Sequence, residues 1–173
     1  MTEAFAGLDR TAELLSWQQE DDDPHRTETM PRIEGHISFE DVHFSYEEDK
    51  PVLRGVSFEV EPGAVVALVG SSGSGKSTMA GLAASFLQPD KGRVLVDGVD
   101  LRGVLLATYR DQLGLVFQDD FLFDGTIREN LRFARPAATD EEVQDAAEKA
   151  YVTEFSDRFP DGLGTVIGER GVK

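Results

Sequence analysis

The chain has 173 residues, 40% of them hydrophobic, a length and composition that suit one globular domain. Its formal net charge of −16 argues against a nucleic-acid partner, because phosphate contacts need clustered Lys and Arg. The absence of cysteine excludes disulfides and zinc–thiolate sites, and no apolar run approaches the roughly 20 residues of a membrane-spanning helix.

The N-terminal part is predicted to contain a helix and a linker. Apolar residues recur near helical spacing from Phe5 to Leu15, so residues 2–17 are predicted to form an amphipathic helix whose apolar stripe needs a partner. Residues 18–34 are acidic, include two prolines, and are interpreted as a linker.

Two antiparallel strands and one buried strand are predicted next. Apolar and polar residues alternate over residues 35–46, with a local break at Glu40 and Asp41, and again over residues 56–60. A turn then leads into the apolar run 64–69, which is typical of a strand buried on both faces.

The most informative motif directly follows that run. Residues 70–78, GSSGSGKST, satisfy the spacing G-x-x-x-x-G-K-[ST], and residues 79–87 continue as a predicted helix. A chance Gly/Ser-rich loop is the alternative, but the motif lies in the strand–loop–helix setting that it requires. The sequence therefore predicts a nucleoside triphosphate site.

Each residue type in this loop has a physical task. Glycines allow the sharp turn, and backbone N–H groups with the helix N-terminus form an anion nest. Lys76 would reach the β- and γ-phosphates, and the Ser77 hydroxyl would serve a Mg²⁺ ion, which prefers oxygen ligands. The predicted nucleotide-binding residues of the loop are Gly70, Ser71, Ser72, Gly73, Ser74, Gly75, Lys76, Ser77 and Thr78.

Shorter elements follow the loop. A strand is predicted over residues 93–97, a short helix over 101–111 and an apolar strand over 113–117. The first of these superficially resembles a strand that ends in a metal-binding aspartate, but Asp97-Gly98 is a strong turn signal, so a strand and turn are favoured.

The later part of the chain is predicted to be mainly helical. Helices are expected over residues 126–133 and 139–152, and the second begins with a capping box made by Thr139 and Glu142.

Tyr46 and Gln118 are further candidates to touch a nucleotide. Tyr46 ends a predicted strand, where its ring could stack on a base, although an ordinary core or edge-strand aromatic is the favoured explanation from the residues alone. Gln118 follows the predicted strand 113–117, whose carboxyl end should open on the phosphate site.

Residues 113–131, LGLVFQDDFLFDGTIRENL, closely resemble the Q-loop region of ATP-binding cassette (ABC) exporters. Together with Tyr46 at the A-loop, the loop 70–78 and the segments 96–102 and 165–171, the resemblance covers roughly residues 33–173. It implies an α/β fold, with a P-loop NTPase (RecA-like) core, an antiparallel β subdomain and the start of a helical subdomain.

The resemblance also implies a domain organisation. Residues 1–17 would end a connector from a membrane domain, residues 18–34 would be an acidic linker, and residues 35–173 would be part of an ABC nucleotide-binding domain. The chain resembles only the first part of that domain and is expected to be truncated at both ends.

By the same resemblance, Tyr46 stacks on adenine, while Ser77 and Gln118 serve Mg²⁺. Lys76 and Gln118 would be the catalytic residues in this chain, and Gln118 would also sense the γ-phosphate. The implied ligands are ATP and Mg²⁺.

The implied partners are a transmembrane domain of the same transporter and a second nucleotide-binding domain, in a homodimer or a heterodimer. Phe121, Leu122, Phe123 and Glu169 would contact the transmembrane domain at the cytoplasmic face of the membrane.

The family's signature motif, Walker B aspartate, catalytic glutamate and switch histidine have no counterpart in the chain. The chain is therefore expected to bind ATP without hydrolysing it, because phosphoryl transfer needs a positioned base, metal and charge-stabilising groups. A stand-alone, non-catalytic ATP-binding adaptor is the main alternative. A soluble P-loop kinase or GTPase is disfavoured by the missing lid arginines and base-reading motifs.

Overall fold

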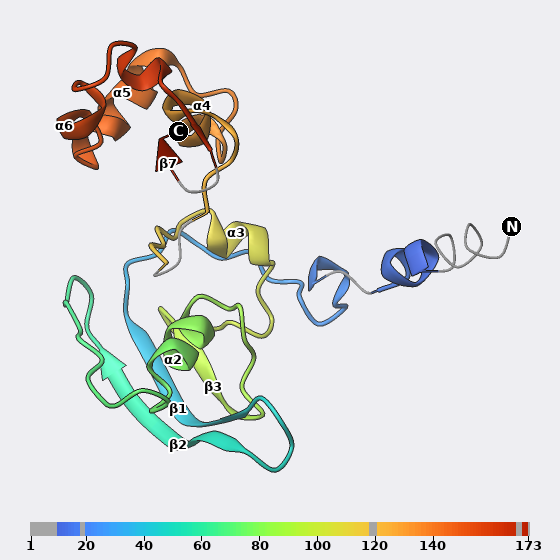
Figure 1. The fold of residues 1–173 in the computed structure, drawn as a ribbon. Coiled ribbons are helices and arrows are strands. Elements are labelled where there is room, and N and C mark those ends of the chain that lie inside the picture. The colour runs from blue at the N-terminus through green and yellow to red at the C-terminus, as the bar shows by residue number, and fades with distance from the viewer. Residues whose placement is uncertain (1–9, 18–19, 118–120, 169–170, 173) are drawn as a thin grey trace, which may run out of the picture. The chain divides into compact units, whose positions relative to one another are not determined.

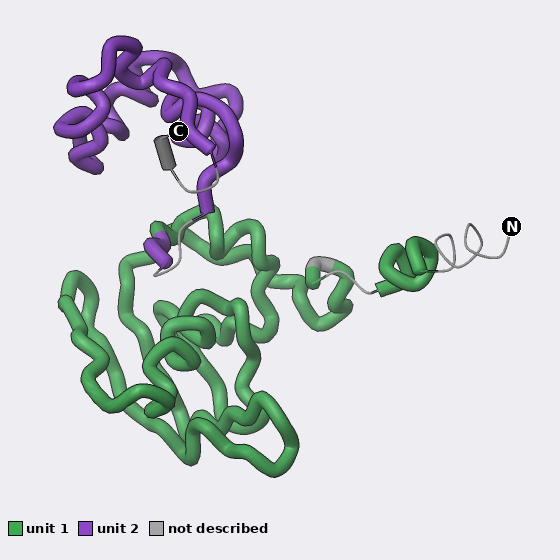
Figure 2. The backbone as a smooth tube through the Cα atoms, in the orientation of Figure 1, with its two compact units in different colours: residues 1–114 green, residues 115–173 purple. Residues whose placement is uncertain are grey.

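The structure, a computed structural model, describes residues 10–17, 20–117, 121–168 and 171–172. The chain divides into two units, residues 1–114 and residues 115–173 (Figure 2). Within the described residues, no helix is long and apolar enough to cross a membrane.

An antiparallel sheet forms the centre of the first unit. Its four strands, in the order β2-β1-β3-β4, are β1 (Ile37–Ser45), β2 (Pro51–Val60), β3 (Lys91–Val96) and β4 (Val99–Asp100) (Figure 1). Phe39 of β1 lies opposite Phe58 of β2 and Val94 of β3, so the alternating apolar residues share one face of the sheet. The antiparallel strands predicted from that alternation are thus present.

A bulge interrupts β1 where the sequence predicts a break. The register shifts after Glu40, and Asp41 has a φ of 48°. Gly92 of β3 fits against this bulge because it has no side chain: a Cβ there would clash with the carbonyl oxygens of Glu40 and Asp41. The close approach of the two strands therefore depends on glycine.

Helix α2 (Lys76–Ala83) packs against this sheet. Its buried Leu82 belongs to the same apolar cluster as Phe39, Val42 and Val96. The loop motif lies at the N-terminus of this helix. Packing of α2 against the antiparallel sheet therefore holds the predicted phosphate site in place.

Residues 26–34, within the predicted linker, are hydrogen-bonded to the segment around α3 (Leu106–Arg110). Arg26 is 5% exposed and donates from Nη1 to the carbonyl oxygens of Leu101 (3.1 Å) and Val104 (3.0 Å). Met30 is buried in the apolar core of the same unit. Just upstream, a short 3₁₀ turn, η1 (Glu20–Asp22), pairs its Glu20 with Arg110 at 2.7 Å.

Two runs predicted as strands, residues 64–69 and 113–117, are not strands in this structure, and the first of them is the run predicted to be buried on both faces. Residues 64–70 and 113–117 have no strand partner among the described residues, and Val65 and Val116 are 99% and 95% exposed. The prediction of burial is wrong here for a physical reason: a strand is buried on both faces only when neighbouring strands extend the sheet on either side of it.

The second unit is mainly helical, as predicted. It contains α4 (Ile127–Arg132), α5 (Asp140–Lys149) and α6 (Thr153–Ser156), with a 3₁₀ turn, η2 (Gly162–Gly164). Three short strands, β5 (Gly125–Thr126), β6 (Val166–Gly168) and β7 (Gly171–Val172), form a small antiparallel sheet in the order β5-β6-β7.

The capping box predicted for α5 is present. The Thr139 hydroxyl accepts from the Glu142 N–H at 3.2 Å, and the Glu142 carboxylate accepts from the Thr139 N–H at 2.8 Å. The helix predicted over residues 139–152 ends earlier, at Lys149, because Tyr151 adopts a φ of 59° before α6 begins at Thr153.

Candidate functional site

The N-terminus of α2 presents unpaired backbone donors. Gly75 caps the helix without a side-chain hydrogen bond, and the first hydrogen bond of the helix runs from Met79 N to Gly75 O at 2.9 Å. The N–H groups of the first turn therefore have no acceptor inside the helix. This turn contains no acidic residue, so its partial positive charge can attract an anion.

Glycines shape the loop before the helix. Gly73 and Gly75 have φ values of 78° and 90°, a region that side-chain-bearing residues rarely adopt. At Gly70 a Cβ would lie 2.6 Å from the Ser74 Oγ. The loop can therefore fold tightly enough to turn several N–H groups toward one point.

Lys76 folds over the loop that precedes it. Its Nζ donates to the carbonyl oxygens of Gly70 at 2.9 Å and Ser71 at 2.7 Å, and lies 3.4 Å from the Ser74 Oγ. Among the residues that the structure describes, the ammonium contacts only these neutral oxygens of the loop. A phosphate oxygen would be a stronger acceptor for the same donors, because its charge strengthens the hydrogen bond.

Tyr46 lies beside the first turn of α2, although 32 residues separate it from its contact there. Its hydroxyl is 3.2 Å from the Thr78 Oγ1, and its ring meets Phe44 edge to face at 4.9 Å between centroids. The side chain is 63% exposed, so the ring offers a flat surface next to the loop. The structure therefore brings together two parts of the predicted site, Tyr46 and residues 70–78.

The two predicted metal ligands are Ser77 and Gln118. Ser77 is exposed in the first turn of α2, and its hydroxyl makes no hydrogen bond within the described part of the chain. It is thus free to supply one oxygen ligand, which fits the preference of Mg²⁺ for oxygen. Gln118 lies outside the described residues.

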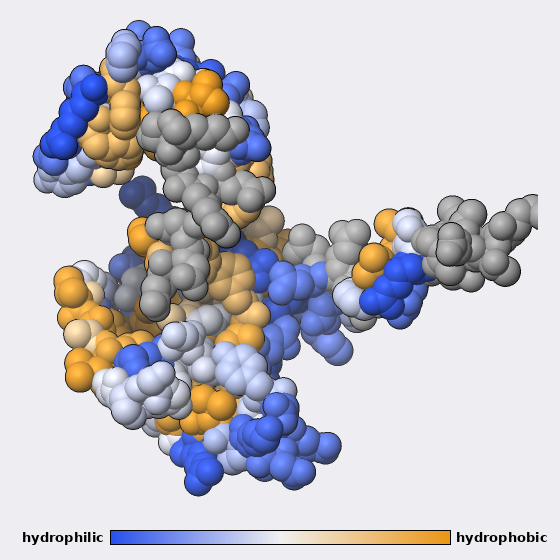
Figure 3. Space-filling model, viewed as in Figure 1, coloured by the Kyte–Doolittle hydropathy of each residue, from blue (hydrophilic) through white to orange (hydrophobic). Residues whose placement is uncertain are grey.

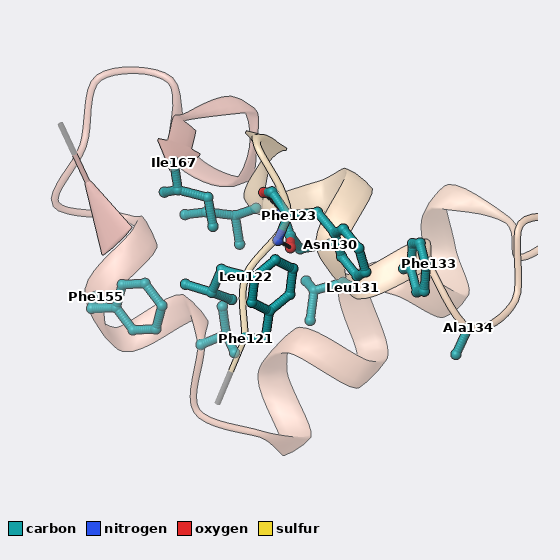
Figure 4. A pocket seen from close by; sticks show the side chains of 11 residues that line it. Phe121, Leu122, Phe123, Asn130, Leu131, Phe133, Ala134, Phe155 and Ile167 are labelled. Atoms are coloured by element: carbon teal, nitrogen blue, oxygen red, sulfur yellow. Dashed lines mark hydrogen bonds between the residues drawn. The ribbon is translucent and has the colours of Figure 1, made fainter. Parts of the chain in front are cut away.

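An apolar groove of about 410 Å³ lies in the second unit (Figure 4). Phe121, Leu122 and Phe123, which the family resemblance implies as contacts with a membrane domain, line it together with Leu131 of α4 and Phe155 of α6. The fourth predicted contact residue, Glu169, is outside the described residues.

Asn130 fixes the wall of this groove and was not identified from the sequence. Its side chain accepts from the N–H of Phe123 at 2.8 Å and donates to the carbonyl oxygen of Phe123 at 2.9 Å. A third bond, 3.0 Å long, joins it to the carbonyl oxygen of Thr126. The only signal in the sequence is a polar amide one helical turn after the cap residue of α4, which alone does not indicate that role.

Comparisons with known proteins agree on one family. The family model described as ABC transporter matches residues 53–166. The ATP-binding/permease protein YgaD of Bacillus subtilis is 43% identical over 174 aligned positions, which cover 100% of this chain and 30% of that protein. A fatty acid ABC transporter ATP-binding/permease protein of Mycobacterium bovis is 38% identical over 96% of this chain and 26% of its own length.

A solved structure is also similar. A bacterial Atm1-family ABC exporter with ATP bound matches 98% of this chain and 30% of its own chain, with a TM-score of 0.86 and 37% identity. The chain therefore spans less than a third of the length of these relatives. The α/β fold with a P-loop NTPase core, expected from the sequence, is confirmed by this likeness.

Proposed function

Because the chain belongs to the ABC transporter family, we propose that it binds Mg-ATP through residues 70–78 as part of the ATPase domain of an exporter. The observation that carries this proposal is the N-terminus of α2, where no side chain of the described residues hydrogen-bonds to the first N–H groups of the helix and the Lys76 ammonium is held at the preceding loop. Such a terminus binds anions through its backbone donors and its dipole, and Lys76 adds a full positive charge.

Each side chain has a proposed task. Lys76 and the amides of residues 70–78 hold the phosphates, while Tyr46 stacks on the adenine through its exposed ring face. Ser77 and Gln118 provide oxygen ligands for the Mg²⁺, which neutralises phosphate charge when bound. Gln118 also orients the group that attacks the γ-phosphate, and with Lys76 it makes up this chain's share of the catalytic residues.

We infer that the 173-residue chain binds ATP without hydrolysing it appreciably. Residues 64–83, which surround the loop in sequence, contain no carboxylate that could act as a general base. Phosphoryl transfer needs more than the positioning of the attacking group proposed for Gln118: it also needs a base, a metal and charge-stabilising groups held around the reacting phosphate. Release of phosphate above a no-protein control, if lost in Lys76→Ala, would contradict this inference.

In the whole protein, we propose that ATP hydrolysis by two such domains, identical or not, drives transport at the cytoplasmic face of a membrane. The proposal is supported by relatives named as ATP-binding/permease proteins. Residues 1–17 would then connect a membrane domain, through residues 18–34, to a nucleotide-binding domain that begins at residue 35. A stand-alone ATP-binding adaptor is the alternative. The coding sequence after residue 173 distinguishes the exporter domain from the adaptor, because only the exporter domain requires the family's remaining motifs to follow.

We propose that the apolar groove of the second unit receives an intracellular loop of the membrane domain, with Phe121, Leu122, Phe123 and Glu169 as contacts. Its apolar lining suits the apolar face of a short helix. In the full-length transporter, Phe123→Cys should cross-link to a cysteine placed in such a loop. Gln144→Cys, on the exposed side of α5, is the control and should not cross-link. Equal cross-linking at both positions would show that the groove is not a specific contact with the membrane domain.

The nucleotide assignment is tested by calorimetric titration of the chain with Mg-ATP. We expect Lys76→Ala to weaken binding by about 10- to 100-fold, the range for loss of a charge-assisted hydrogen bond. Lys149→Ala removes the same charge from an exposed position in α5 and should leave the affinity unchanged. Indistinguishable curves for the wild type and Lys76→Ala would refute the assignment.

A further inference from the structure

The end of the β1–β2 hairpin touches the phosphate loop at two separate points. At the first, the Tyr46 hydroxyl lies 3.2 Å from the Thr78 Oγ1. At the second, Val52 and Leu53 of β2 lie against Gly75, where a Cβ would come within 3.3 Å of the Val52 Cγ1 and 2.8 Å of the Leu53 Cδ2. One rigid element thus contacts both the loop and the first turn of α2.

The hydroxyl contact joins a buried group to an exposed one. Thr78 is only 4% exposed, and Tyr46 is the one polar side chain that its hydroxyl contacts within the described part of the chain. A buried hydroxyl is costly to leave without a partner, so this hydrogen bond is favoured over its loss. The bond therefore fixes the tip of the Tyr46 side chain.

The Tyr46 ring is held at a second place by Phe44. Phe44 is buried in the core, and its ring meets Tyr46 at an interplanar angle of 88°. With its tip bonded to Thr78 and its side against Phe44, the ring has little freedom to rotate, although most of its surface is open to solvent. A ring that is already oriented loses less entropy when a base stacks on it.

We propose that Thr78 is a positioning residue: its hydrogen bond to Tyr46 sets the distance and angle between the base-stacking ring and the phosphate loop. This inference rests on the proposed function, in which Tyr46 stacks on adenine and residues 70–78 bind phosphate. It adds that Thr78 contributes to binding of the base through Tyr46, and not only to binding of phosphate through its place in the loop.

The test compares affinities for Mg-ATP and for inorganic tripolyphosphate, which lacks base and ribose. We expect Tyr46→Phe and Thr78→Val each to lower the ratio of the two affinities by about 3- to 10-fold, the range for loss of one hydrogen bond. In the double variant the ratio should fall no further, because both changes remove the same bond. Thr78→Ser keeps the hydroxyl and should keep the wild-type ratio.

Two results would overturn the proposal. Tyr46→Phe could bind Mg-ATP as the wild type does, or the two changes could lower the ratio additively, which would mean that Thr78 and Tyr46 act separately. Tyr46→Phe removes one oxygen from an exposed side chain, so a folding defect is not expected to obscure the result. Failure of the proposed function looks different, because the wild type would then bind neither ligand or would not depend on Lys76.

Discussion

At the residue scale, Asp97 is the clearest case of a carboxylate committed to structure. Its oxygens accept from the backbone N–H groups of Glu34 at 2.7 Å, Gly35 at 3.0 Å and His36 at 2.8 Å. Asp97 and Gly98 have φ values of 51° and 81°, and Val96 pairs with Val99 across them. The turn predicted from Asp-Gly is confirmed. The Asp97 carboxylate binds the backbone N–H groups that directly precede β1.

This arrangement lowers the pKa of Asp97. Burial, the largest single influence, raises the pKa, but hydrogen bonds from the backbone of His36, Glu34 and Gly35 together outweigh it and leave the pKa below its ordinary value of 3.8. A folded-state pKa below the unfolded one means that the ionised carboxylate stabilises the fold above the unfolded pKa. That stabilisation is lost as the pH falls through the folded-state value.

We therefore expect Asp97→Asn to lower the free energy of unfolding by about 1–3 kcal/mol at pH 7, because an amide oxygen is a weaker acceptor than a carboxylate. The loss should begin to shrink as the pH falls below about 4, the unfolded-state pKa, and should be smallest below the lower folded-state pKa, where the folded wild-type carboxylate also becomes neutral. Denaturant unfolding at pH 7 and at several lower pH values measures it. Asp90→Asn, at an exposed position, is the matched control, and an equal effect from both changes would contradict the structural role.

At the element scale, the sequence predicts best those elements whose signals are local. Alternating apolar residues correctly predict the antiparallel strands β1 and β2, and the capping residues correctly predict the start of α5. The same capping pattern at Thr126 and Glu129 starts α4, with the Thr126 hydroxyl accepting from Glu129 N at 3.1 Å. These features depend on residues three or four positions apart, so the sequence contains them directly.

Elements that depend on distant partners are predicted less well. The run 64–69 has the composition of a buried strand, but its burial depends on neighbouring strands that the run itself cannot supply. Residues 26–34 have the composition of a linker, yet Arg26 and Met30 are buried against residues that lie more than 70 positions further along the chain. Composition alone contains no signal for such contacts.

The candidate site divides in the same way. The loop motif predicts the uncapped helix and its lysine, because spacing within nine residues determines both. The contact of Tyr46 with Thr78, and that of Leu53 with Gly75, join segments more than 20 residues apart through the packing of a hairpin on a helix. These contacts exist only in the tertiary fold, so no local pattern in the sequence predicts them.

At the scale of the whole molecule, exposed apolar segments favour association with a second copy, whereas a large net charge opposes it. Val65, Val69 and Val116 are almost fully exposed in runs whose backbone has no strand partner in the described parts of the chain. Apolar patches are visible on the surface beside strongly hydrophilic regions (Figure 3). Such open edges favour pairing with another chain, whereas a net charge of −16 repels a second copy.

We expect the 173-residue chain to self-associate, and to do so more strongly as salt is added. Salt shortens the range of repulsion to about 8 Å at 0.15 M and about 3 Å at 1 M, while apolar contacts persist. Sedimentation velocity at increasing salt concentration measures the shift from monomer to larger species. A monomer at every salt concentration would show that the exposed apolar segments do not join copies of the chain.

The role of these exposed segments is tested by the paired change Val65→Lys with Val116→Lys, which should reduce association. Lysine is the stringent choice, because it lowers the net negative charge and so weakens the repulsion that keeps copies apart. Leu15→Lys is the control: Leu15 is exposed in the N-terminal helical segment, whose apolar side chains could also associate. If Leu15→Lys abolishes association and the paired change does not, the copies associate through the N-terminal segment and not through the exposed segments around Val65 and Val116.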